Sequence, residues 1–124
     1  MDKPLSPTEL ATIDVTGRPF LHEQGSFAGR GYVVALRLDE ESWSLDIRDV
    51  EVFDPITRHW SHETDADTYG GEIRSEHTVQ RCPKTGLITL NGYASVVWIA
   101  PPERSWSSVD WPEGDVYPGG PMAG

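Results

Sequence analysis

The residues best spaced for chemistry lie in an acidic stretch just past the middle of the chain. Asp65, Asp67, Gly70 and Glu76 occupy the first, third, sixth and twelfth places of a calcium-binding loop. Tyr69 fills the fifth place, where a side-chain carboxylate or amide is needed. The residues that follow alternate like a strand, whereas a calcium loop is followed by a helix. The pattern therefore predicts a solvated acidic loop and no calcium site.

Four histidines and one cysteine are the other candidates for metal binding or catalysis. His59 and His62 precede several carboxylates, but their three-residue spacing suits a helix and this segment is expected to be a strand. Cys82 has only His77 as a nearby base, and His22 can join these residues only through tertiary contacts. The sequence contains no nucleophile elbow, phosphate loop or zinc-protease motif. We therefore predict no enzymatic activity, no metal and no cofactor.

The net charge of the chain indicates which kinds of partner it can bind. Ten Lys and Arg against twenty Asp and Glu give a formal net charge of −10. Nucleic acids and anionic membranes are bound through basic surfaces, so direct binding to either is not expected. A basic protein, or a nucleic-acid-binding protein whose groove carboxylates can occupy, is the expected partner. The alternative is that acidity only keeps a small protein in solution.

We predict that carboxylates steer this partner and that aromatic side chains anchor it. The predicted partner-binding residues are Asp39, Glu40, Glu41, Glu63, Asp65, Asp67, Trp106, Trp111 and Tyr117. The predicted function is that of a small acidic protein that binds and blocks another macromolecule, as an inhibitor, an immunity protein or a phage anti-defence protein does. One alternative is a structural or oligomeric subunit, such as a phage particle component. A small-ligand or metal-binding β domain is the less favoured alternative.

A β-hairpin over residues 30–54 is the strongest structural signal in the sequence. The even-numbered side chains from Tyr32 to Leu38 are apolar and are predicted to face the core. In the second strand the apolar residues are odd-numbered from 43 to 47, whereas Val50 and Val52 are even-numbered. One extra residue must be absorbed between these two runs. The shift predicts a β-bulge near residues 48–49.

The N-terminal segment carries the signature of a helix start. Ser6 is followed by proline at the first helical position and by Glu9 three residues later, which is the pattern of a capping box. A helix that begins at Pro7 and ends at Ala11 or Ile13 is expected to lie against the sheet.

Weaker patterns predict the rest of the fold. In chain order we expect a strand at 58–60 alongside 50–53, a surface loop at 61–71, an edge strand at 72–81, a turn with a left-handed glycine at 83–86, and a last strand at 87–100 with a kink or bulge at Asn91–Gly92. The predicted fold class is mostly β, an antiparallel sheet of six or seven strands arranged as a small sandwich or partly closed barrel.

Two further features concern the ends of the chain and its compartment. Residues 1–100 are expected to form one β-rich domain, and residues 101–124, rich in Pro, Gly and Trp, an irregular arm that packs on the sheet or anchors a partner. A single cysteine, Cys82, and the lack of an apolar leader or spanning segment predict a cytoplasmic protein without disulfides.

Overall fold

One antiparallel sheet forms the body of the protein. The computed structural model describes residues 3–24, 27–54, 56–63, 68–75, 77–92 and 95–102, together with Val109 and Trp111. These residues form nine strands and one short helix, α1 (Pro7–Leu10). The strands are β1 (Lys3–Pro4), β2 (Pro19–Gln24), β3 (Phe27–Leu38), β4 (Ser42–Asp54), β5 (His59–His62), β6 (Thr68–Glu72), β7 (Val79–Arg81), β8 (Ile88–Gly92) and β9 (Ser95–Ile99).

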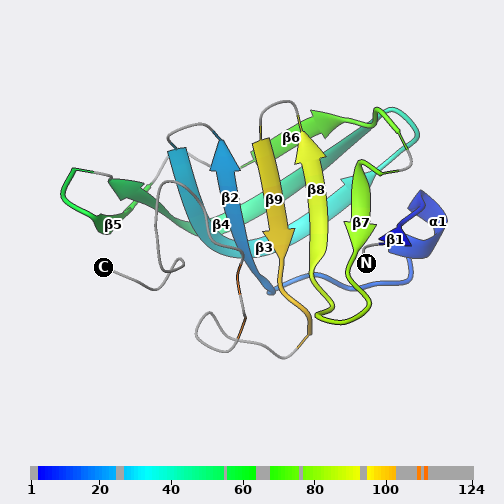
Figure 1. Ribbon diagram of the computed structural model, residues 1–124, viewed down its shortest axis with the longest axis horizontal. Coiled ribbons are helices and arrows are strands. Elements are labelled where there is room, and N and C mark those ends of the chain that lie inside the picture. Colours follow the sequence, from blue (N-terminus) through cyan, green and yellow to red (C-terminus); the bar gives the residue numbers. More distant parts are fainter. Residues whose placement is uncertain are drawn as a thin grey trace.

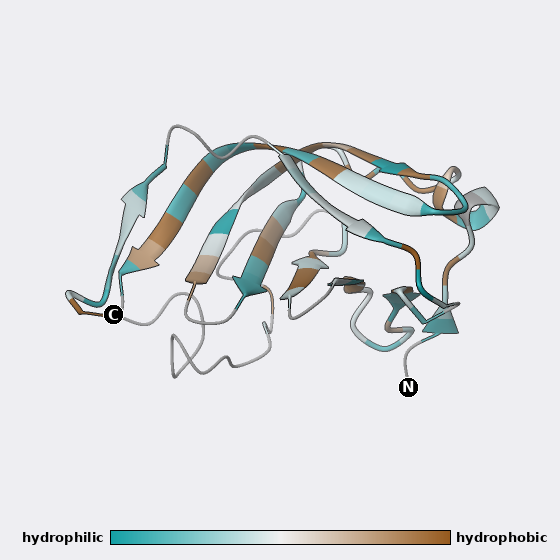
Figure 2. Ribbon diagram, turned by 90° about the horizontal axis from the view of Figure 1, so that it is seen from above, coloured by the Kyte–Doolittle hydropathy of each residue, from teal (hydrophilic) through white to brown (hydrophobic). Residues whose placement is uncertain are grey.

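The order of the strands explains the shape of the sheet. They are arranged as β1-β7-β8-β9-β2-β3-β4-β5, and β6 pairs with β4 beside β5. The sheet curves strongly, so that the long β3 and β4 cross behind β2, β9 and β8 (Figure 1) and the sheet forms an arch when seen from above (Figure 2). The prediction of a mostly β antiparallel fold is confirmed, but the sheet does not close into a barrel and has nine strands.

The predicted hairpin and its bulge are both present. β3 and β4 are antiparallel, and Asp39 N donates to Ser42 O at 3.0 Å across the turn. Arg30 faces Glu51 and Tyr32 faces Arg48, so β4 has one extra residue at this point. Asp49 takes up the irregularity with a φ of 54°. Because a bulge bends the strand and increases its twist, this one contributes to the curvature of the sheet.

A second bulge makes part of the predicted core face of β3 wrong, at Val34, whereas Leu36 and Leu38 pack against the core as expected. Val33 pairs with Ile47 and Ala35 with Asp46, which leaves Val34 as an extra residue of β3. Val33 is fully buried, whereas Val34 is 44% exposed, the reverse of the predicted arrangement. Alternation in the sequence cannot show this bulge, because the extra residue and the one before it are both valine and both faces then look apolar.

Two weakly patterned regions also differ from the expectation. The segment 61–71 contains β6, which pairs with the first half of β4. Among the described residues after Glu72, where β6 ends, only those of β7 form a strand before residue 82. Residues 87–100 are two antiparallel strands, β8 and β9, in which Gly92 faces Ser95. Asn91–Gly92 therefore ends β8 and does not kink a single strand. The other turn follows the prediction, with Gly86 at a φ of 79°.

Apolar side chains fill both faces of the sheet. Adjacent residues of β2 illustrate this, because Phe20 belongs to one cluster and Leu21 to the other, and both are fully buried. The first cluster lies inside the arch and includes Val33, Leu45 and Ile99. The second cluster comprises Leu21, Ala28, Phe53, Leu87, Ala100 and Trp111, with Trp60, Trp98 and Val109 packed against it.

Candidate functional site

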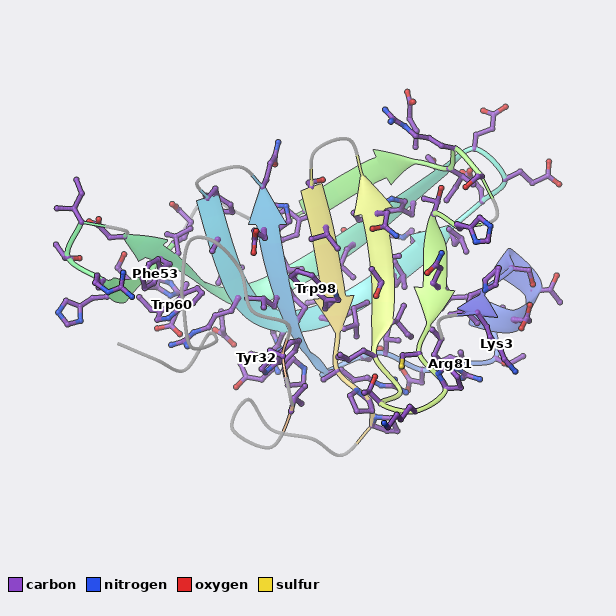
Figure 3. All side chains as sticks on the ribbon, in the orientation of Figure 1. Lys3, Tyr32, Phe53, Trp60, Arg81 and Trp98 are labelled. Carbon is purple, nitrogen blue, oxygen red and sulfur yellow. The ribbon has the colours of Figure 1, made fainter. Side chains whose placement is uncertain are left out.

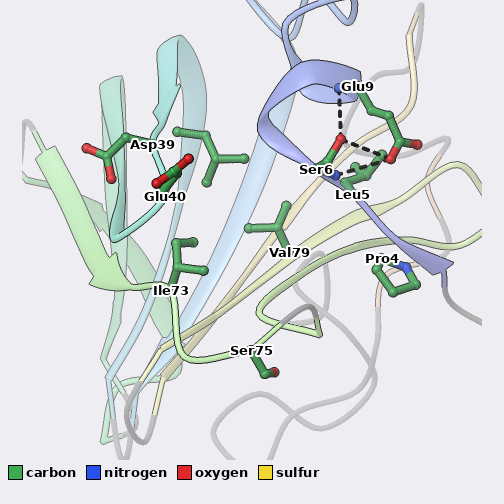
Figure 4. A pocket seen from close by; sticks show the side chains of 10 residues that line it. Pro4, Leu5, Ser6, Glu9, Asp39, Glu40, Ile73, Ser75 and Val79 are labelled. Carbon is green, nitrogen blue, oxygen red and sulfur yellow. Dashed lines mark hydrogen bonds between the residues drawn. The ribbon is translucent and has the colours of Figure 1, made fainter.

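A groove with an apolar lining lies at the β1 edge of the sheet. Its volume is about 460 Å³, which lies within the range of small-ligand and peptide-anchor pockets. It opens between the N-terminal segment, the tip of the β3–β4 hairpin and the segment after β6 (Figure 4). We call it the acidic groove; its walls are Pro4, Leu5, Ser6, Glu9, Leu38, Asp39, Glu40, Ile73, Ser75 and Val79.

A capping box fixes the first wall of the acidic groove. Glu9 N donates to Ser6 Oγ at 3.2 Å, and Ser6 N donates back to Glu9 Oε1 at 3.3 Å. Leu5 precedes the cap and Leu10 follows four residues after it, and both are buried in the first cluster, as in a hydrophobic staple. The predicted helix start is confirmed, and a four-residue helix is held by its cap and by burial.

Ser6→Ala is expected to lower the free energy of unfolding by about 1 kcal/mol, the usual cost of losing an N-cap side chain. Ser6→Asp keeps an acceptor at the cap and should retain most of the stability. Urea unfolding followed by tryptophan fluorescence measures both variants. Thr8→Ala, an exposed position in the same turn, is the matched control. An equal loss in Thr8→Ala and Ser6→Ala would contradict the role given to the cap.

The second wall is the turn between β3 and β4. Asp39 Oδ1 accepts hydrogen bonds from the backbone N–H groups of Glu41 and Ser42, each at 2.7 Å. These two bonds hold the pKa of the Asp39 carboxyl below its ordinary value, so the group stays ionised at neutral pH. Ile73 N donates to Glu41 O at 2.8 Å, which attaches the third wall to the same turn.

The floor of the acidic groove is apolar and rigid. Leu5 is 8% and Val79 3% exposed, and Leu5 N donates to Val79 O at 2.8 Å. Leu38 and Ile73 are partly buried and pack against the first cluster beside them. The floor residues pack against the first cluster behind them. An apolar group placed in the groove would therefore be taken out of water without a rearrangement of the sheet.

All of the charge at the rim is negative. Glu9, Asp39 and Glu40 line the acidic groove, and its other wall residues are uncharged. None of the wall residues is a histidine, cysteine or lysine, and the uncharged polar wall residues are Ser6 and Ser75. An apolar floor with a carboxylate rim suits a ligand that combines an aliphatic or aromatic group with a positive charge.

The predicted partner-binding residues are divided between several places. Asp39 and Glu40 line the acidic groove, and Glu41 is exposed in the same turn. Glu63 lies after β5, where its backbone N donates to Val50 O, outside the groove. Trp111 is only 6% exposed and packs in the second cluster, so its indole is covered by its own chain. Asp65, Asp67, Trp106 and Tyr117 lie outside the described residues.

The candidate metal residues are also dispersed. Among the described residues no group of three or more His, Cys, Asp or Glu side chains is placed to hold a metal ion. Gly70, the turn glycine of the calcium pattern, lies within β6, and Asp65, Asp67 and Glu76 lie outside the described residues. His22 is buried in β2, and its ring lies 4.1 Å from that of Tyr69, centroid to centroid.

The sequence patterns identified the charged rim of the groove but not its floor. The hydrophobic staple was a usable signal for Leu5, since it places an apolar residue directly before the cap. Val79 and Ile73 gave no such signal, because they meet Leu5 only after β7 pairs with β1 and the segment 73–75 returns to the hairpin turn.

Comparison of the chain with family models, curated proteins and solved structures found no match. Within the described residues, no helix has the length and apolar character that a membrane crossing needs.

Proposed function

We propose that this chain is a small acidic interaction protein that binds and covers a basic segment of another protein. The acidic groove carries the proposal. Its floor supplies apolar area, and its rim carries the three carboxylates Glu9, Asp39 and Glu40. The expected occupant is a peptide segment that presents an aliphatic or aromatic side chain next to Lys or Arg.

The two parts of the groove have different roles in this proposal. Long-range attraction between a chain of net charge −10 and a basic partner raises the association rate, because opposite charges steer the encounter. Burial of one apolar side chain over Leu5 and Val79 then lengthens the lifetime of the complex, since buried anchors contribute most of the binding free energy. An inhibitor of a basic protein needs both properties.

A short fluorescent peptide in which one leucine is flanked by lysines should bind the protein, and the same peptide with glutamates in place of the lysines should not. Fluorescence anisotropy at low and at physiological salt measures both affinities. The affinity of the basic peptide should fall as salt rises, because the rim charges are exposed and screened. Equal binding of the two peptides would contradict the proposal.

Two variants locate the binding in the groove. Glu40→Gln removes one rim charge and should weaken binding of the basic peptide several-fold at low salt, whereas Asp49→Asn removes the same charge from the exposed bulge outside the groove and should weaken it less. Asn is well suited to the positive φ of that position. Ser75→Phe adds bulk to the groove wall and should abolish binding at any salt concentration. An unchanged affinity in Ser75→Phe would place the peptide elsewhere.

A further inference from the structure

The geometry points to a second ligand site, a binding pocket for a small organic phosphate formed by Arg18 and Arg81. Both arginines line a depression of about 560 Å³ beside the segment that connects α1 to β2. Its remaining walls are Thr12, Ile13, Asp14, Cys82, Pro83, Gly86, Ile88 and Pro102. We call it the arginine pocket.

Positive charge is concentrated around the arginine pocket although the chain as a whole is acidic. Lys3 and Arg81 are direct cross-strand partners in β1 and β7, and Figure 3 shows them at the same edge of the sheet. Like charges directly opposite each other in a sheet are destabilising. Burial lowers the pKa of Arg18, the charge of Asp14 opposes this change, and the charge of Arg81 adds to it. The arrangement therefore costs stability in the absence of an anion.

The charges of the two arginines are only partly balanced within the described part of the chain, by Asp14 near Arg18. Arg18 and Arg81 form no ion pair with a described residue. Arg18 Nη1 donates to Ala100 O at 3.5 Å, which orients the guanidinium and leaves its charge in place. Asp14 lines the same pocket, but its Oδ1 accepts from Thr16 N at 3.0 Å in a local turn. Charged groups that lower the stability of the fold and form no stabilising contact in it are characteristic of binding sites.

The chemistry of the pocket selects the class of ligand. Guanidinium groups bind phosphate and carboxylate oxygens through paired hydrogen bonds, and two of them match a phosphate monoester, which carries nearly two negative charges at neutral pH. Ile13 and the two prolines supply apolar surface beside the charges. The pocket is larger than a free phosphate ion requires, so the expected ligand is a monoester with a small apolar or aromatic group.

Phenyl phosphate is a suitable probe, with benzoate as the carboxylate of similar shape and sulfate as the control for general salt effects. Isothermal titration calorimetry should show saturable binding of phenyl phosphate. Benzoate should bind more weakly than phenyl phosphate. Arg81→Gln should weaken phenyl phosphate binding by about tenfold or more, equivalent to about 1.4 kcal/mol. Arg37→Gln, which removes the same charge from an exposed residue paired with Asp46, should leave the affinity within about twofold of the wild type.

Thermal unfolding gives a second readout that a purely structural role would not produce. Without ligand, Arg81→Gln should melt at the same temperature as the wild type or higher, because the repulsion of Arg81 by Lys3 and Arg18 is removed. With phenyl phosphate in excess the wild type should melt above the variant, since the ligand stabilises only the protein that binds it. Equal shifts in wild type, Arg37→Gln and Arg81→Gln, or a lower melting temperature of Arg81→Gln in the absence of ligand, would overturn the proposal.

Discussion

Phe20→Ala is expected to lower the free energy of unfolding by about 3 to 5 kcal/mol, the range found when a buried phenylalanine is truncated. Phe20 is fully buried in the centre of the sheet, and its ring meets that of Tyr69 edge-on with centroids 5.6 Å apart. Two contributions make up the loss: the transfer free energy of the ring, and the free-energy cost of the cavity that remains because the surrounding sheet cannot close it. Together they would remove a large part of the stability of a domain of this size.

Equilibrium urea unfolding, followed by tryptophan fluorescence, measures this loss. Phe27→Ala is the matched control, because it makes the same chemical change on the adjacent strand at a ring that is 37% exposed. Its cost should be smaller by at least about 2 kcal/mol, since less apolar area leaves the core. Similar losses in the two variants would show that the first cluster does not hold the sheet together as described.

The hairpin and its first bulge were predictable from the sequence because they are local. The change from odd to even apolar positions around residues 48–49 required an extra residue in the strand, and the structure places it there. Gly31 was a second signal. A Cβ on this residue would lie 2.8 Å from Arg48 O, and a glycine inside a strand often marks such a close approach of backbone.

The later strands were less predictable because their boundaries depend on pairing. β6 consists of Thr68, Tyr69, two glycines and Glu72, and it is a strand because the outer edge of β4 is available to it. Tertiary pairing thus overrides a composition that favours a loop. The strand order of the sheet, with β2 between β9 and β3, is likewise a long-range property that no local pattern contains.

The same division applies to the candidate sites. The acidic turn at 39–41 and the capping box are local features, and both now form walls of the acidic groove. The arginine pocket was not predicted, because Arg18 and Arg81 are far apart in the sequence and meet only through the fold. The net charge of the chain indicated a basic partner. Because it is a single sum over all residues, it could not show the local concentration of positive charge around the arginine pocket.

His22 should make the stability of the protein depend on pH. Burial lowers the pKa of His22 from 6.5 to about 4 in the folded state, because the charged ring would be taken out of water. Between pH 6.5 and about pH 4 the histidine is protonated in the unfolded chain but neutral in the folded protein. Protons therefore favour the unfolded state in this interval. Stability is therefore complete above pH 6.5 and falls as the pH drops toward 4, by about 2 kcal/mol at pH 5 and about 3 kcal/mol at pH 4.

His22→Phe isolates this contribution, because it keeps an aromatic ring against Tyr69 and removes the titrating group. Unfolding free energies of both proteins at about pH 7.5 and about pH 5 give the difference directly. Acidic groups such as Asp39, whose pKa is lowered by backbone hydrogen bonds, lose stabilisation at still lower pH in both proteins and cancel. Tyr69, whose burial raises its pKa to about 12, does not titrate in this interval. If wild type and His22→Phe lost equal stability between the two pH values, the buried neutral state of His22 would be wrong.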